Sequence, residues 1–235
     1  MLAILLIVMQ SCAHVSNIYS GIVWFLLSTT LVITNDVFAY IVGIRFGKTP
    51  LIALSPKKTV EGFFGGSVFT CIWAVVAVNI LSQMDFFLCP QPDLMGLPFS
   101  GVTKLQCSDD FKAFFFEKVK IPFIEVEFSM LSLHALVMAL FASLVAPFGG
   151  FFASGFKRAF RIKDFGDLIP GHGGVTDRFD CQIVMGLFCH VYLHTFVYST
   201  GVVSVDTMKR LSETLSPADR QQLISHLMML GGRIK

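Results

Sequence analysis

Long stretches without a charged residue dominate the pattern of hydrophobic and polar positions along this 235-residue chain. No charged residue precedes Asp36, and three further uncharged runs cover 62–84, 128–156 and 181–205. Each run reaches the roughly 20 residues that an α-helix needs to cross a hydrocarbon core about 30 Å thick. The pattern predicts five hydrophobic helical segments, at about 1–18, 21–44, 62–84, 130–152 and 182–204.

These segments predict an all-α, polytopic integral membrane protein with about five transmembrane helices. We expect residues 1–204 to form the membrane domain and residues 205–235 to form a short soluble helical tail. Residues 1–10 have no basic n-region and no clear cleavage site, so they do not indicate a signal peptide. We expect them to continue a helix that begins earlier in a longer protein.

The segments that connect the predicted helices differ in charge. Residues 45–61 carry four basic residues and one acidic residue, and residues 153–181 carry five basic and four acidic residues. Residues 85–129 carry seven acidic and four basic residues. Because basic residues in short loops favour the cytoplasmic side, we expect 45–61 and 153–181 to meet at the cytoplasmic face, opposite 85–129.

Composition and cysteine spacing narrow the function classes. Hydrophobic residues make up 54% of the chain and charged residues 14%, whereas a soluble domain carries about a quarter charged residues. The chain has no basic stripe of the kind that nucleic acid requires. The six cysteines form no CxxC pair, so they indicate neither a zinc site nor a redox motif. Cys89 and Cys107 share one connecting segment and could form a disulfide if it is extracytoplasmic.

The densest group of polar residues lies between 154 and 180. Lys157, Arg158, Arg161 and Lys163 place four cations within seven residues. Arginine and lysine both suit phosphate oxygens, so this cation cluster fits a phosphate site. A basic loop beside anionic lipid head groups would have the same composition. The four cations alone leave both interpretations open.

Glycines and aspartates in the same segment favour a site for phosphate and metal. Gly173 and Gly174 follow His172, and glycines let backbone N–H groups approach an anion closely. Asp177 and Asp180 are three residues apart, so on a helix they share one face. Paired carboxylates among cations suit a hard metal ion such as Mg²⁺.

Two further polar features lie nearer the N-terminus. A carboxylate near the bilayer centre costs about 2.5–3.5 kcal/mol, so we expect a site role for Asp36, although it could lie close to the cytoplasmic end of its helix. Lys57 and Lys58 could hold phosphate or anchor the next helix at the membrane interface. Ser55 or Thr59 could cap that helix. Three glycines near its start permit close helix packing: Gly62, Gly65 and Gly66.

Residues 154–180 resemble the signature of the CDP-diacylglycerol synthase (phosphatidate cytidylyltransferase) family. That signature reads S-x-x-K-R, four residues, K-D, and then P-x-H-G-G-x-x-D-R-x-D. Two upstream stretches, Asn35 to Lys48 and Ser55 to Gly62, also resemble the family, and the likeness is to its eukaryotic branch. All fixed positions of the signature are filled, by Ser154, Lys157, Arg158, Lys163, Asp164, Pro170, His172, Gly173, Gly174, Asp177, Arg178 and Asp180.

The chain differs from bacterial members of this family at two positions. Those members usually have an aspartate four residues before the signature serine and a glutamate directly before it. This chain has Gly150 and Ala153 there. If the bacterial aspartate binds metal, this chain needs a substitute, and Asp36 is a candidate.

The resemblance implies that CTP and phosphatidic acid react to give CDP-diacylglycerol and pyrophosphate, with Mg²⁺ required, for phospholipid biosynthesis. Because the lipid phosphate is itself the nucleophile, we expect neutralisation and alignment of two anions to dominate catalysis. The expected metal ligands are Asp177, Asp180 and Asp164. The expected catalytic residues are Lys157, Arg158, Lys163, Asp164, His172, Asp177, Arg178 and Asp180. The expected substrate-binding residues are Asn35, Asp36, Lys57, Lys58, Ser154, Gly173 and Gly174.

The same resemblance implies CTP, phosphatidic acid and the lipid bilayer as partners, no nucleic acid, and compatibility with a homodimer. It also implies an integral membrane protein of the endoplasmic reticulum whose site faces the cytoplasm. Two alternative functions stay open. One is a CTP-dependent polyprenol kinase, which transfers the γ-phosphate. The other is a transporter with Asp36, His190 and His194 as an ion path, although no inverted repeat supports it.

Overall fold

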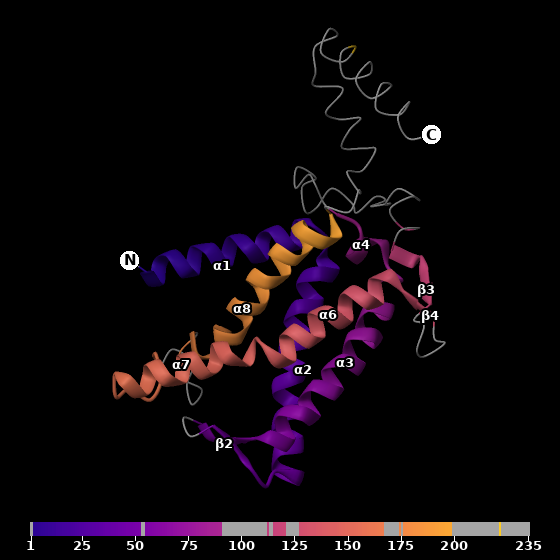
Figure 1. Ribbon diagram of the computed structural model, residues 1–235. Helices are drawn as coiled ribbons and strands as arrows, with labels where there is room; N and C mark the ends of the chain where they lie inside the picture. Colours follow the sequence, from indigo (N-terminus) through magenta and orange to yellow (C-terminus); the bar gives the residue numbers. More distant parts are fainter. Residues whose placement is uncertain are drawn as a thin grey trace. The chain divides into compact units, whose positions relative to one another are not determined.

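The computed structural model describes a mostly helical chain (Figure 1). The residues that it describes are 2–52, 55–90, 112, 115–120, 127–166, 174, 176–198 and 221. The longer helices are α1 (Leu2–Tyr19), α2 (Ile22–Phe46), α3 (Val60–Leu81), α6 (Met130–Leu144), α7 (Pro147–Ala159) and α8 (Thr176–Tyr192). The shorter elements are α4 (Asp85–Leu88), β1 (Pro50–Ile52), β2 (Ser55–Thr59), β3 (Lys118–Lys120), β4 (Glu127–Ser129) and the π-helix η1 (Leu193–Val197).

Where the structure describes them, the predicted hydrophobic segments lie on helices, but fewer than five described helical stretches are long and apolar enough to cross a membrane. Within the described residues, three stretches meet that standard: Ile22–Phe46, Val60–Leu81 and Met130–Ala159. The last stretch comprises α6 and α7, which are separated by a turn before Pro147 at the first position of α7. The expected count of about five transmembrane helices is therefore not confirmed.

Two short antiparallel hairpins depart from the all-α expectation. β1 pairs with β2 between α2 and α3, and β3 pairs with β4 ahead of α6. The two hairpins lie at opposite ends of the α2–α3 pair (Figure 1). Since α2, α3 and α6 alternate in direction, the β1–β2 hairpin and α7 share one end. The expectation that 45–61 and 153–181 lie near one another is supported by Lys58 and Asp180, which both act electrostatically on Asp36.

Helices α2 and α3 pack closely because glycines remove side chains from their interface. A Cβ added to Gly66 would lie 3.0 Å from the carbonyl oxygen of Asn35, and one on Gly62 would lie 2.5 Å from that of Ala39. The packing role predicted for these glycines is confirmed. Thr59 caps α3 by accepting a hydrogen bond from the Gly62 N–H at 3.2 Å, which selects one of the two candidate caps, Ser55 and Thr59, that the sequence left open.

The opposite end of the α2–α3 pair is closed by the segments around α4. Asp85 accepts a hydrogen bond from Lys112 at 2.7 Å, and the Phe115 ring packs against Trp24 with 5.9 Å between centroids. Cys89 is disulfide-bonded, and Cys107, its expected partner, lies outside the described residues. The pairing of Cys89 with Cys107 therefore stays a prediction.

The chain divides into two compact units, Met1–Val191 and Tyr192–Lys235. In the first unit, α1 is held to α8 by a hydrogen bond of 3.0 Å from the Asn17 side chain to the Gly186 carbonyl. Of the second unit, the structure describes Tyr192–Tyr198 and Gln221. The predicted soluble tail at 205–235 lies otherwise outside the described residues, so that prediction stays a prediction.

Enlarging Gly66 tests the α2–α3 interface. We expect Gly66→Val to destabilise the protein by about 1–3 kcal/mol, because the new side chain meets the backbone and side chain of Asn35. The measurement is thermal unfolding in detergent, followed with a thiol-reactive dye at the buried free cysteines Cys181 and Cys189. Val68→Leu enlarges a 60% exposed position of the same helix and is the matched control. Equal melting temperatures for the two variants would contradict the close packing.

Candidate active site

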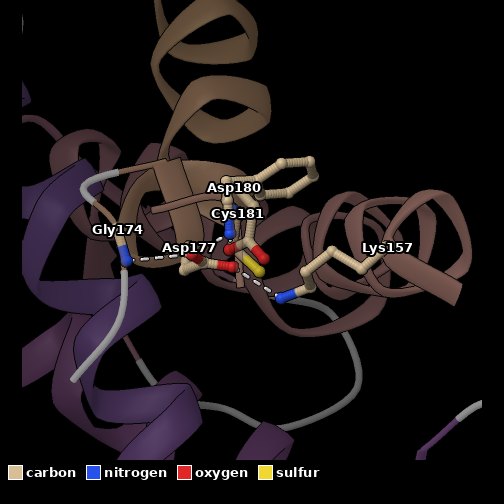
Figure 2. Close-up of polar contacts among 6 residues, drawn as sticks. Lys157, Gly174, Asp177, Asp180 and Cys181 are labelled. Carbon is tan, nitrogen blue, oxygen red and sulfur yellow. Dashed lines mark hydrogen bonds and ion pairs between the residues drawn. The ribbon is translucent and has the colours of Figure 1, made fainter. Parts of the chain in front are cut away.

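The Asp177 carboxylate is the centre of the densest polar contacts in the described part of 154–180 (Figure 2). It lies in the first turn of α8, and its Oδ1 accepts a hydrogen bond of 2.6 Å from Lys157 Nζ of α7. Its Oδ2 accepts backbone hydrogen bonds from Phe165 at 2.8 Å and from Gly174 at 3.0 Å. One side chain thus joins the end of α7, the segment that follows it and the start of α8.

The Lys157–Asp177 pair is largely enclosed. The Lys157 side chain is 13% exposed and that of Asp177 is 7% exposed. Burial by itself raises the pKa of Asp177, but the Lys157 ammonium and the two backbone N–H groups outweigh that effect and hold the pKa below its ordinary value. The aspartate is therefore ionised and paired at neutral pH.

Gly174 has to be a glycine because two groups approach it closely. A Cβ at this position would lie 2.9 Å from the Gly166 nitrogen and 3.2 Å from Asp177 Oδ2. The sequence predicted that Gly174 contacts substrate. In the structure its N–H is donated to Asp177, so the described contacts of this glycine position an acidic side chain.

A second acidic group lies one turn further along α8. Asp180 Oδ1 accepts a hydrogen bond of 2.7 Å from the backbone of Cys181. Its Oδ2 faces Gly150 of α7, where an added Cβ would lie 3.3 Å away. Asp36 of α2 is attracted electrostatically by Lys58 of β2 and repelled by Asp180. Side chains from α2, β2 and α8 therefore interact beside α7.

This grouping bears on the missing aspartate at position 150. The absence of a side chain at Gly150 leaves room for the Asp180 carboxylate. The exposed Asp36 is a third carboxylate within electrostatic range of the same region. The role of Asp36 as a substitute carboxylate stays a prediction, and its electrostatic interaction with Asp180 is compatible with that role.

The remaining predicted residues divide into four groups. Arg158 and Lys163 are exposed, whereas Ser154 and Asp164 are half-buried. Asn35 is buried against α3, where its Oδ1 accepts a long hydrogen bond of 3.5 Å from Thr70, and the described contacts do not bring it to the Lys157–Asp177 pair. The predicted positions outside the described structure are His172, Gly173 and the side chains of Lys57 and Arg178.

The last turn of α7 ends in a Schellman motif with an arginine in the glycine position. The Ile162 N–H bonds to the Lys157 carbonyl at 3.0 Å, and the Arg161 N–H bonds to the Arg158 carbonyl at 3.1 Å. Arg161 has a φ of 56°, the only positive φ among the described non-glycine residues. The left-handed conformation costs a side-chain-bearing residue roughly 1–2 kcal/mol, so this arginine is held under strain.

The carboxylates fit a divalent ion only if substrate and water complete its shell. Within the described ranges, no three His, Cys, Asp or Glu side chains form a group that could hold a metal ion. Mg²⁺ usually keeps several waters and takes one or two carboxylates together with substrate phosphates. Asp180 and Asp36 suit that limited role, whereas Asp177 Oδ1 is already paired with Lys157.

Some contacts of the site carried no sequence signal. Phe165 acts on Asp177 through its backbone N–H, which every residue except proline possesses. The Lys58 ammonium lies over the face of the Phe151 ring. In the sequence, an aromatic residue within a charge-free segment indicates only an apolar position. Cation–π spacing between distant segments becomes visible only in three dimensions.

Comparisons with known proteins identify the family to which this chain belongs. Residues 1–196 match the Cytidylyltransferase family, and the chain belongs to that family. It is 49% identical over 233 residues to phosphatidate cytidylyltransferase 1 of Arabidopsis thaliana, covering 96% of this chain and 53% of that protein.

Two further relatives carry the same name. The phosphatidate cytidylyltransferase of Saccharomyces cerevisiae is 46% identical over 236 residues, covering 97% of this chain and 50% of that protein. The phosphatidate cytidylyltransferase of Caenorhabditis elegans is 43% identical over 233 residues, covering 96% of this chain and 49% of that protein. The chain spans about half the length of these relatives.

Removing the Asp177 charge tests the buried ion pair. We expect Asp177→Asn to destabilise the protein by about 3–5 kcal/mol, because Lys157 is left buried without its partner. The double variant Lys157→Met/Asp177→Asn should recover part of that loss. Because the folded-state pKa of Asp177 lies below that of the unfolded chain, its stabilisation is complete above about pH 4 and is lost as the pH falls through the folded-state pKa.

Unfolding in detergent across pH 3–7 measures both effects. The control is Glu127→Gln, which removes an exposed ion pair of 3.4 Å with Lys118 and should cost less than about 1 kcal/mol. A double variant as unstable as Asp177→Asn alone would contradict the assigned pairing.

Proposed function

We propose that this chain carries the catalytic part of a phosphatidate cytidylyltransferase, which converts CTP and phosphatidic acid into CDP-diacylglycerol and pyrophosphate. The observation that carries the proposal is the Lys157–Asp177 pair beside Asp180, built from residues of one dense signature. Relatives at 43–49% identity that bear this name support it.

The reaction requires no nucleophile from the protein. An oxygen of the lipid phosphate attacks the α-phosphorus of CTP, the bond from that phosphorus to the bridging oxygen breaks, and pyrophosphate leaves with the electron pair. Both reactants are anions, so the residues have to neutralise and align them. In the proposal, phosphate oxygens are held by Lys157, Arg158, Lys163 and Arg178.

The other predicted residues have supporting roles in this proposal. Lys58 balances the charges of Asp36 and Asp180, and His172 orients a phosphate or an aspartate. Mg²⁺ would be held by Asp180, with Asp36, Asp177 or Asp164 completing the protein ligands, and would supply charge neutralisation at the phosphates. The remaining substrate contacts are assigned to Lys57, Ser154 and Gly173, whereas Asn35 packs against α3 and Gly174 positions Asp177.

The proposed location is the endoplasmic reticulum membrane, with the site at the cytoplasmic face. The basic segments 45–61 and 153–181 belong to the end of the bundle that carries the site. The disulfide at Cys89 belongs to the opposite end, and disulfides persist in oxidising compartments such as the lumen. Two independent features therefore support the same orientation.

Product analysis tests the proposed reaction. We expect the purified protein to form CDP-lipid and pyrophosphate from labelled CTP, phosphatidic acid and Mg²⁺. Asp180→Ala should lower kcat at least about 100-fold, because the proposed carboxylate ligand of the Mg²⁺ at the substrate phosphates is lost. Glu127→Gln neutralises an exposed acid elsewhere and should keep wild-type kcat. Lipid phosphate with CDP as products would instead identify a lipid kinase, and substrate flux without CTP would identify a transporter.

Single cysteines at the two ends test the proposed orientation in sealed microsomes, after Cys12 and Cys71 are replaced. We expect a membrane-impermeant maleimide added outside to label Lys163→Cys, because this exposed position belongs to the cytoplasmic end. Lys118→Cys, whose native side chain is 71% exposed, should react only after the membrane is permeabilised. The reverse labelling pattern would overturn the orientation.

A further inference from the structure

Helix α7 has two faces of opposite character. Its buried face carries Gly150 and Phe151, which lie against Asp180 and Lys58. Its other face carries phenylalanines four residues apart, which lie along one side of a helix. Their exposed fractions are 60% for Phe148, 76% for Phe152, 45% for Phe156 and 64% for Phe160. We call these four residues the phenylalanine stripe.

Cations flank the end of the stripe. Arg158, Arg161 and Lys163 are exposed, whereas the fourth cation of the cluster, Lys157, turns inward to Asp177. Arg161 occupies a left-handed position where glycine would be unstrained. A strained backbone that keeps a long charged side chain points to a role for that side chain.

The stripe is connected to the candidate active site through one aromatic ring. The Phe156 ring lies 6.0 Å from the Phe165 ring, centroid to centroid. Lys157 Nζ lies 5.5 Å from the centroid of the same Phe165 ring, and the Phe165 N–H bonds to Asp177. Phe165 therefore contacts both the stripe and the Lys157–Asp177 pair. The head group of an amphiphile whose chains lie on the stripe would lie close to that pair.

We propose that the phenylalanine stripe with Arg158, Arg161 and Lys163 is the docking surface for the lipid substrate, phosphatidic acid. This inference rests on the proposed function and adds the route by which the lipid reaches the site. The apolar rings match its acyl chains, and the exposed cations match its phosphate monoester. That group can carry more negative charge than the singly charged phosphodiester of most other phospholipids. That charge complementarity favours an anionic lipid over an apolar protein partner.

Arg161 gives a test that separates docking from stability. Arg161→Gly places the favoured residue in the left-handed position, so the melting temperature should stay equal or rise. The KM for phosphatidic acid, measured as its mole fraction in mixed micelles, should nevertheless rise about tenfold, because a charge-assisted contact is lost. The kcat and the KM for CTP should stay within about twofold. A purely structural role predicts no loss of lipid affinity.

The stripe is tested with a matched pair of phenylalanines. Phe152→Ser should raise the KM for phosphatidic acid about fivefold, because apolar contact with the acyl chains is lost. Phe64→Ser changes a 65% exposed phenylalanine of α3 and should leave it unchanged. Equal effects of the two variants, or no effect of Phe152→Ser and Arg161→Gly, would overturn the docking surface.

Photo-crosslinking supplies a readout that needs no CTP. Phosphatidic acid with a diazirine on its acyl chain should crosslink within residues 148–165, and unlabelled phosphatidic acid should compete better than phosphatidylcholine. Crosslinking to other segments, equal competition, or protein–protein crosslinks from a photoreactive residue at position 152 would overturn the inference. If the wild-type protein forms no CDP-lipid yet crosslinks as expected, the proposed reaction fails while lipid docking stands.

Discussion

The described site depends on Asp177, which accepts three hydrogen bonds. Its two oxygens hold the Lys157 ammonium, the Phe165 N–H and the Gly174 N–H, which belong to three successive segments. Buried ion pairs are weak sources of stability, because desolvation offsets much of their attraction. Their value here is geometric: Lys157 is held near the phosphate-suited cluster at a fixed position before any anion arrives.

The break between α6 and α7 allows the two faces of α7 to be oriented independently of α6. At 1.5 Å per residue, the 15 residues of α6 extend about 22 Å, which falls short of a hydrocarbon core about 30 Å thick. The turn before Pro147 then lets α7 begin with its own rotation, so Gly150 faces Asp180 while Phe152 faces outward. A single helix can thus carry the proposed lipid-docking stripe on one face and border the charged site with the other.

The sequence predicted most of the helices and the composition of the site, but not how the site is assembled. Charge-free runs located α2 and α3 because membrane helices need sustained apolar length. Asp177 and Lys157 were named from residue chemistry, and their pairing is visible only once α7 and α8 pack together. Phe165 contributes a backbone group, and Gly150 contributes empty space, so neither offered a side-chain signal. The β1–β2 hairpin was not predicted, because Ser55 to Thr59 has a polar composition typical of a loop.

The balance of charges in the described site bears on how the proposed phosphate substrates would bind. Asp36, Asp177 and Asp180 face only Lys58 and Lys157 among the described contacts, so the inner site has no excess of positive charge. Incoming phosphates must therefore be neutralised by the outer cations and a divalent ion, or must compete with Asp177 for Lys157. Competition would release Asp177 Oδ1 from its ion pair at the moment when a phosphate needs a partner. We infer that anion arrival and exposure of this carboxylate are coupled, so that Asp177 can serve in turn as the partner of Lys157 and as a metal-ligand candidate.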